Sequence, residues 1–156
     1  MSLPPFQTVL DAHREDVLRF LVASVGRQEA DDVFQETFLA ALRAYPRLRR
    51  TDNLRGWLLK IAHNKAIDAF RARKRAPLPT EAVDAVADGT PVDARLPDQE
   101  LWNAVRTLPE RQRTAVVLRF SFDLAYREVG QVMESTEDAA RRNVFEGLKK
   151  LREVYA

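Results

Sequence analysis

A stretch without apolar periodicity in the middle of the chain constrains the fold more than any other feature. Residues 77–98 contain four of the eight prolines, one glycine, and five acidic residues against one arginine. Proline and glycine interrupt helices and strands, and this segment offers no regular apolar face for a core. The sequence therefore predicts an acidic flexible linker at 77–98 between two small domains, residues 1–76 and 99–156, because units of this size can each bury a core.

Both flanking segments show the apolar spacing of helices, and neither reads as a strand. Gly26 and Pro46 stand where they would end the first two helices. The predicted helices of the first domain cover 6–25, about 29–45, and a span that begins at a cap among 51–53 and ends at 75. Those of the second lie near 98–107, 109–121, 125–133 and 137–154. The predicted fold is all-α, with a three-helix domain followed by a four-helix domain.

Composition argues against several classes of function. The chain has no cysteine, and its two histidines, His13 and His63, lie fifty residues apart, so we expect neither a metal nor a cofactor. No carboxylate stands in a recognisable spacing with a nucleophile or a phosphate loop, so we do not expect an enzyme. The apolar runs are too short to span a bilayer and residues 1–6 do not resemble a signal peptide, so we expect no membrane insertion and a cytoplasmic location.

Charge is distributed unevenly along the chain. The net charge is about +5 for residues 1–76, about −4 for 77–98 and about +1 for 99–156. Basic ends joined by an acidic connector indicate an anionic partner for the ends, with nucleic acid the leading candidate.

The last two predicted helices are separated by about three residues, which is the spacing of a helix-turn-helix. Ser135 or Thr136 can cap the second of them. The side chains predicted to face inward are Val129, Val132, Met133, Ala140, Val144, Leu148 and Leu151. This leaves Arg141, Arg142 and Asn143 on another face, where they could reach DNA. Taken alone, the pattern fits an ordinary packing helix with a solvated face equally well.

Several motifs resemble those of the sigma-70 family. Residues 31–38, DDVFQETF, closely resemble the most distinctive motif of its region 2.2, and residues 53–68, NLRGWLLKIAHNKAID, are similar to regions 2.3 and 2.4 of the extracytoplasmic-function (ECF) group. Residues 108–113, LPERQR, and 124–129, LAYREV, look like the start of region 4 and its first DNA-binding helix. The resemblance covers nearly the whole chain apart from the linker. It implies a sigma factor that directs promoter-specific transcription initiation.

The resemblance also implies partners and roles for particular residues. Core RNA polymerase would be bound through its β′ clamp and β subunit, with Asp32, Gln35 and Glu36 on the clamp; promoter DNA and an anti-sigma factor are the other implied partners. Residues at the -10 element would come from the loop at 47–53 and from the helix that follows this loop: Arg49, Arg50, Asp52, Asn53, Lys60, Asn64, Lys65, Arg71, Arg73, Lys74 and Arg75. Arg141, Arg142 and Asn143 would enter the major groove of the -35 element. Trp57 could stack a base, although its apolar neighbours favour a place in the core.

The second domain departs from the family at several positions. Glu134 and Ser135 replace the usual glycine and apolar residue of the turn, Ala125 replaces the usual serine before Tyr126, and residues 145–148 replace an arginine-rich helix end. These departures keep open a sigma-derived adaptor that binds polymerase without reading promoters. A second alternative is a stand-alone helix-turn-helix regulator, although no dimerisation helix is evident. Two tethered domains could also adopt an open polymerase-bound form and a compact inhibited one.

Overall fold

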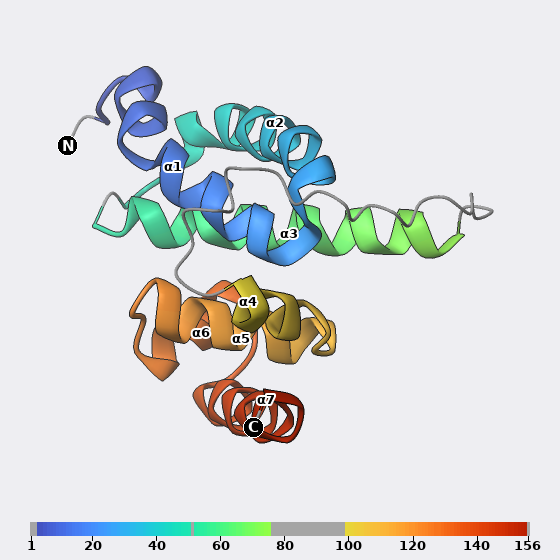
Figure 1. Cartoon of the computed structure of the whole chain (residues 1–156). Helices are drawn as coiled ribbons and strands as arrows, with labels where there is room; N and C mark the ends of the chain where they lie inside the picture. The colour runs from blue at the N-terminus through green and yellow to red at the C-terminus, as the bar shows by residue number, and fades with distance from the viewer. Residues whose placement is uncertain (1–2, 51, 76–98, 156) are drawn as a thin grey trace.

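The computed structural model describes residues 3–50, 52–75 and 99–155, so the predicted linker lies outside the described residues. The first group of helices comprises α1 (Phe6–Val25), α2 (Arg27–Ala44), a 3-10 turn (Tyr45–Arg47) and α3 (Leu54–Arg75). The second comprises α4 (Gln99–Arg106), α5 (Glu110–Ser121), α6 (Tyr126–Val132) and α7 (Glu137–Tyr155). The described ranges contain no strand, which confirms the all-α prediction (Figure 1).

Local capping explains where three of the helices begin or end. Gly26 adopts φ 89°, a backbone conformation that glycine tolerates, and its N–H donates to the Val22 carbonyl at 3.0 Å to end α1. The Asn53 side-chain oxygen accepts the Gly56 N–H at 3.0 Å at the start of α3. Thr136 Oγ1 accepts the Ala139 N–H at 3.0 Å at the start of α7. Asn53 and Thr136 are therefore the caps among the candidates that the sequence offered.

The first three helices enclose a core between α1, α2 and α3. Its fully buried side chains include Val17, Phe20, Leu21, Leu58 and Leu59. Thr37 is also buried on α2, and its hydroxyl donates to the Val33 carbonyl at 2.8 Å, which satisfies the polar group inside its own helix. Burial of α3 extends along a wide stripe because the helix packs against α1 and α2 and also against α6.

The second group of helices forms the predicted helix-turn-helix, in which α6 and α7 pack together and α5 also packs on α7. Val129, Val132 and Met133 of α6 and its end are buried as predicted, as are Ala140, Val144 and Leu151, while Leu148 is half-buried. Gly147, one of the departures from the family, lies where α7 meets α5. A Cβ there would come within 2.8 Å of Val116 Cγ2, so the small residue permits the close approach of the two helices.

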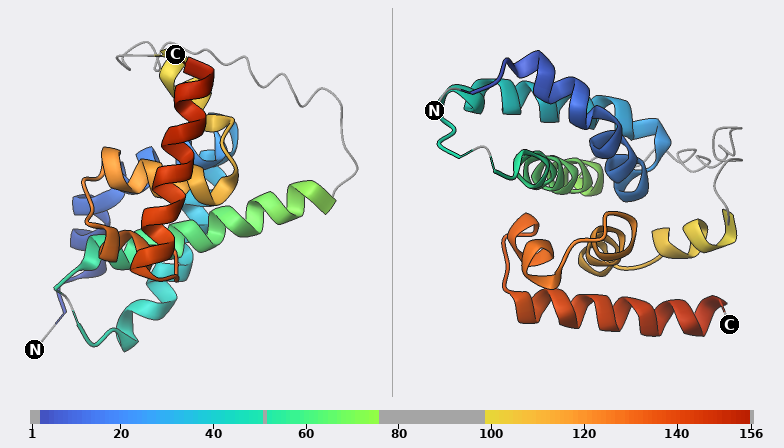
Figure 2. Two further views of the ribbon diagram at one scale, coloured as in Figure 1. Left: turned by 90° about the horizontal axis from the view of Figure 1, so that it is seen from below. Right: turned by 90° about the vertical axis from the view of Figure 1, so that its left-hand side faces the viewer.

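The two groups of helices pack directly on one another. In the right-hand view of Figure 2, α1 and α2 form one outer layer, α3 lies beneath them, α4, α5 and α6 form the next layer, and α7 is outermost on the opposite side. Helix α3 contacts α6, and α1 contacts α4 and α5. The structure therefore shows a compact arrangement of the two domains.

The start of α6 lacks half of a capping box. Glu128 accepts the Ala125 N–H at 3.0 Å, but alanine has no side-chain oxygen to accept a helix N–H in return. Because Ala125 is exposed and already has the extended backbone of a cap, we expect Ala125→Ser to raise the free energy of unfolding by about 1 kcal/mol. Urea denaturation checks this. Ala139→Ser, inside the first turn of α7, should give no such gain.

Candidate functional site

An outward stripe on α2 combines acidic, amide and apolar side chains. Asp32, Gln35 and Glu36 are exposed, and one helical turn further on Leu39 and Leu42 are 52% and 50% exposed. Residues three or four positions apart lie next to one another on a helix, so these side chains form one continuous stripe. Exposed leucines beside carboxylates are suited to a protein partner with an apolar strip and basic groups.

A groove of about 510 Å³ runs along one side of this stripe, between α2 and α3. Asp32 and Glu36 line it from α2, and Asp68 and Arg73 line it from α3. Arg73 also forms an ion pair with Glu29 at 3.0 Å, so this member of the predicted DNA-binding set lies against α2. The predicted polymerase-docking residues thus lie together, on an edge that is predominantly acidic.

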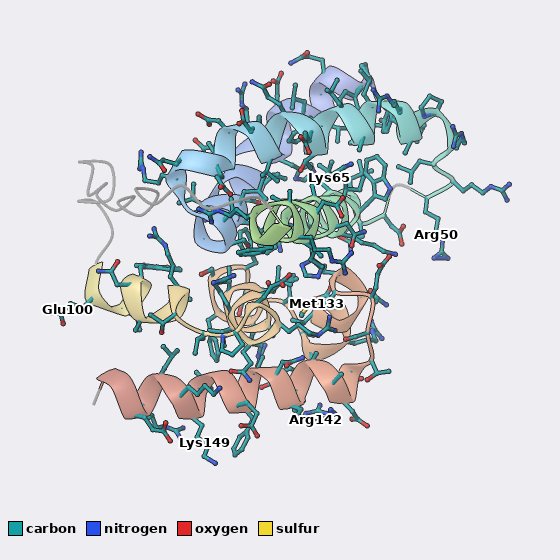
Figure 3. All side chains as sticks on the ribbon, turned by 90° about the vertical axis from the view of Figure 1, so that its right-hand side faces the viewer. Arg50, Lys65, Glu100, Met133, Arg142 and Lys149 are labelled. Atoms are coloured by element: carbon teal, nitrogen blue, oxygen red, sulfur yellow. The ribbon has the colours of Figure 1, made fainter. Side chains whose placement is uncertain are left out.

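The loop before α3 carries the first predicted -10 residues. Arg49, Arg50, Asp52 and Asn53 are all exposed, and Figure 3 shows Arg50 extending from the tip of the loop. A cleft of about 800 Å³ begins here and is lined on the first-domain side by Arg50, Asp52, Asn53, Trp57 and Lys60. Its other wall is α6, which contributes Arg127, Glu128 and Gln131. Helix α6 therefore stands opposite three of the four predicted -10 residues of the loop, which are Arg50, Asp52 and Asn53.

The remaining predicted -10 residues spread along α3. Trp57 is half-buried, with its ring 6.2 Å from that of Tyr45, so it belongs partly to the core and partly to the cleft. Asn64 and Lys65 are half-buried, whereas Arg71 is exposed near the far end. A helix of 22 residues is about 33 Å long, so Arg50, which precedes α3, lies far from Arg71, which is near the end of it. Lys74 and Arg75 complete α3, and their side chains lie outside the described ones.

Phe122, directly after α5, joins the two domains. Its side chain is 3% exposed and its ring centroid lies 6.2 Å from that of Phe20 in α1. The Arg19 guanidinium lies 4.7 Å from the Phe122 ring, and Arg55 donates to the Phe122 carbonyl at 3.3 Å. Sequence reasoning missed this contact because a phenylalanine at a helix end looks like a residue of its own domain's core.

Two further contacts join α3 to the second domain. Lys60 forms an ion pair of 3.6 Å with Glu134, which lies in the turn between α6 and α7. Glu134 has a φ of 55°, a left-handed conformation in which glycine is unstrained, so the residue that departs from the family gains an interdomain ion pair at some cost in backbone strain. Arg113 of α5 places its guanidinium 4.9 Å from the Phe70 ring of α3.

His63 of α3 is buried beside these contacts, with 2% of its surface exposed. Burial lowers its pKa to about 4; the positive charge of Arg111 on α5 also lowers it, and the negative charge of Glu134 opposes the shift. Its Nε2 atom has no hydrogen-bond partner among the described residues. His63 is therefore neutral at pH 7, and the environment that the packed domains create disfavours its protonation.

This burial predicts a loss of stability in mild acid. Because the pKa of His63 is lower in the folded chain than its ordinary value of 6.5, the unfolded chain binds the proton first as pH falls. The contribution of His63 to the free energy of unfolding is therefore fully present above about pH 6.5. It is lost as the pH falls from 6.5 to 4, which lowers the free energy of unfolding by about 3 kcal/mol at most. Urea denaturation at pH 7 and pH 5 measures it. In a His63→Gln variant, the free energy of unfolding should change with pH only through His13, whose pKa is also lowered by burial. If the variant loses as much stability between pH 7 and pH 5 as the wild type does, this assignment is contradicted.

The predicted -35 residues occupy the first half of α7 but differ in their surroundings. Arg142 is exposed, and Figure 3 shows Arg142 and Lys149 projecting from the side of α7 that faces away from the rest of the molecule. Arg141 is exposed but forms ion pairs with Glu137 at 3.1 Å and Asp138 at 3.5 Å. Asn143 is half-buried. Arg142 is thus the most accessible of the three.

These features define an all-helical protein whose second domain carries a helix-turn-helix. Residues 9–76 match sigma-70 region 2 and residues 98–151 match sigma-70 region 4. The RNA polymerase sigma factor SigV of Bacillus subtilis is 26% identical, over 93% of this chain and 87% of its own. The RNA polymerase sigma factor CarQ of Myxococcus xanthus is 31% identical, over 96% and 88%. The chain belongs to the ECF group of the sigma-70 family, and it is an RNA polymerase sigma factor that acts in promoter-specific transcription initiation.

A solved structure has the same fold. It is the co-crystal structure of the sigma factor RpoE with the anti-sigma factor NepR from Bartonella quintana, with a TM-score of 0.75 and 21% identity over 95% of this chain and 94% of that one. Within the described ranges of the present chain, every helix is too short or too polar to cross a membrane.

Proposed function

We propose that the outward stripe of α2 binds the coiled coil of the β′ clamp, with Asp32, Gln35 and Glu36 as the polar contacts. The observation that carries this proposal is the continuity of the exposed carboxylates with Leu39 and Leu42 on one helical face. Acidic groups steer and orient a basic partner, while the leucines supply apolar area.

The promoter contacts divide between the two domains. In this proposal, the loop residues Arg49, Arg50, Asp52 and Asn53 take up a base of the -10 element. One amide and six basic residues along α3 follow the DNA backbone: Asn64, Lys60, Lys65, Arg71, Arg73, Lys74 and Arg75. Helix α7 enters the major groove at the -35 element, where Arg142 can address guanine. Every step is binding, so the chain needs no catalytic group of its own.

The compact arrangement serves, in this proposal, as the inhibited form. Helix α6 forms the opposite wall of the cleft that holds Asp52, Asn53 and Trp57, and Lys60 is engaged by Glu134. Helix α6 therefore restricts the access of DNA to this cleft, and separation of the domains would remove that restriction. The relative that was solved with an anti-sigma factor supports a similar partner here, one that would favour the compact form. The site of action would be the cytoplasm, where bacterial polymerase and DNA lie.

Run-off transcription tests the proposal. Purified core polymerase is incubated with fragmented DNA from the source organism, with and without this protein. New and specific transcripts are the expected result. Binding to core without transcripts would instead support the sigma-derived adaptor. Binding to DNA as a dimer without polymerase would support a stand-alone regulator. If the chain binds neither core polymerase nor DNA, the proposal is overturned.

A further inference from the structure

His63 lies on the face of α3 that meets the second domain. Lys60, one helical turn before it, pairs with Glu134 of the turn between α6 and α7. Phe70, two turns after it, lies 4.9 Å from the Arg113 guanidinium of α5. Positions separated by three and by seven residues share one face of a helix. The side chain of His63 is therefore buried on a face whose contacts on either side are made by the second domain.

The charges that act on His63 also belong to the second domain. They are the guanidinium of Arg111 on α5 and the carboxylate of Glu134. The buried side chains of α1, α2 and α6 carry no charge, and those of α1 and α2 are apolar apart from the hydroxyls of one serine and one threonine. On α3 itself, Lys60 shares the face of His63 and is paired with Glu134. The second domain thus brings one cation to His63 and one carboxylate that already has a basic partner.

A second proton on the His63 ring has no acceptor in the compact form. The Nε2 atom is buried and has no hydrogen-bond partner among the described residues. A neutral imidazole can leave this nitrogen unprotonated, whereas an imidazolium carries an N–H on both ring nitrogens. In the compact form this N–H would be a buried, charged donor without an acceptor, which costs more than burial of the neutral ring. Separation of the domains would admit water to the ring and remove the charge of Arg111.

We propose that protonation of His63 in mild acid releases the second domain from α3 and opens the chain while both domains remain folded. The helices of each domain pack mainly on one another, so separation exposes the interface alone, whereas unfolding would expose both cores. The loss of stability in acid therefore falls first on the interface. The opening does not depend on promoter contacts. Its consequence, that more of the chain can bind polymerase in acid, rests on the proposed function.

The size of the effect follows from linkage. If His63 has its ordinary pKa of 6.5 in the open form and a pKa of about 4 in the compact form, the ratio of open to compact molecules rises roughly twentyfold from pH 7 to pH 5. Single-molecule energy transfer between dyes on Gln28→Cys and Lys149→Cys measures this ratio in the full-length chain. His63→Gln should abolish the rise, because an amide does not titrate in this range.

The matched control is His13→Gln, which removes the other histidine of the chain. The charges that act on His13, from Asp16 and Arg55, belong to the first domain, so this variant should retain the rise in open molecules. Circular dichroism should show the same helix content at pH 7 and pH 5. If the wild-type ratio of open to compact molecules does not change with pH, the proposal is overturned. It is also overturned if helix content falls together with energy transfer, because acid then unfolds the chain.

A titration of the His63 ring followed by nuclear magnetic resonance needs no substitution at His63. In the wild-type chain the ring should remain neutral down to pH 5. In Phe122→Ala chains that energy transfer shows to be open, the pKa of His63 should rise toward 6.5, because the ring is then hydrated. Equal pKa values in the compact and opened chains would show that the first domain alone buries His63, which contradicts the proposal. None of these measurements uses polymerase or promoter DNA, so failure of the run-off assay would leave their outcome unchanged.

Discussion

A Gln35→Lys/Glu36→Lys variant is expected to lose promoter-specific run-off transcription completely. The two substitutions place positive charge in the middle of the outward stripe of α2, where the proposed partner surface is basic, and like charges in an interface cost several kcal/mol. We expect the affinity for core polymerase to fall by more than a hundredfold. Affinity is measured by fluorescence titration of labelled chain with core enzyme, in parallel with transcription.

The matched control for this variant is Glu15→Lys, a charge reversal at an exposed position of α1 in the same domain. It should leave both core binding and transcription unchanged. Both variants alter only exposed side chains, so their unfolding free energies should remain within about 0.5 kcal/mol of wild type. Wild-type transcription by the double variant would show that the stripe of α2 does not bind the clamp.

A Phe122→Ala variant is expected to separate the two domains. Phe122 is buried between them, and truncating a buried phenylalanine costs about 3–5 kcal/mol. The cost falls on the compact form, because the ring contacts Phe20 and Arg19 of the first domain. The ratio of open to compact molecules should therefore rise a hundredfold or more. Energy transfer between dyes on Gln28→Cys and Lys149→Cys should fall, and the native chain has no cysteine to compete for the labels.

The matched control is Phe120→Ala, which removes the same side chain two residues earlier, where it is 59% exposed. This variant should retain full energy transfer. The opened Phe122→Ala variant should also bind single-stranded -10 DNA more tightly than wild type, because α6 no longer covers the cleft. If energy transfer falls while single-stranded DNA binding stays the same, the domains separate but the compact form does not block the -10 surface.

The helices could be predicted from the sequence because their ends depend on neighbouring residues. Gly26, Asn53 and Thr136 act within a few positions of themselves, and the apolar spacing of each helix predicts its buried face. The packing of one domain on the other depends on contacts such as Lys60 with Glu134, which lie far apart in the chain. No periodicity relates these residues. For the same reason, an unusual residue such as Glu134 could be noticed in the sequence but not explained.

The candidate sites likewise differ in how far the sequence alone predicts them. The stripe of α2 lies on a single helix, so the spacing of Asp32, Gln35 and Glu36 along the chain is enough to place them together. His63 is different, because the charges that act on it reach it only where α5 and the turn before α7 lie against α3. The sequence placed Arg141 beside Arg142, yet the ion pairs of Arg141 give the two neighbours different surroundings.

Packing of the two domains within one chain makes the balance between the forms independent of protein concentration. Diluting the chain does not open it, and expressing more of it does not close it. The open fraction instead scales the apparent affinity for polymerase, so a chain that is open one time in a hundred requires about a hundredfold more core enzyme for the same occupancy. Substitutions at Phe122 would therefore change the fraction of molecules that can bind polymerase. They would reset how much polymerase this sigma factor captures in competition with others while leaving its promoter preference unchanged.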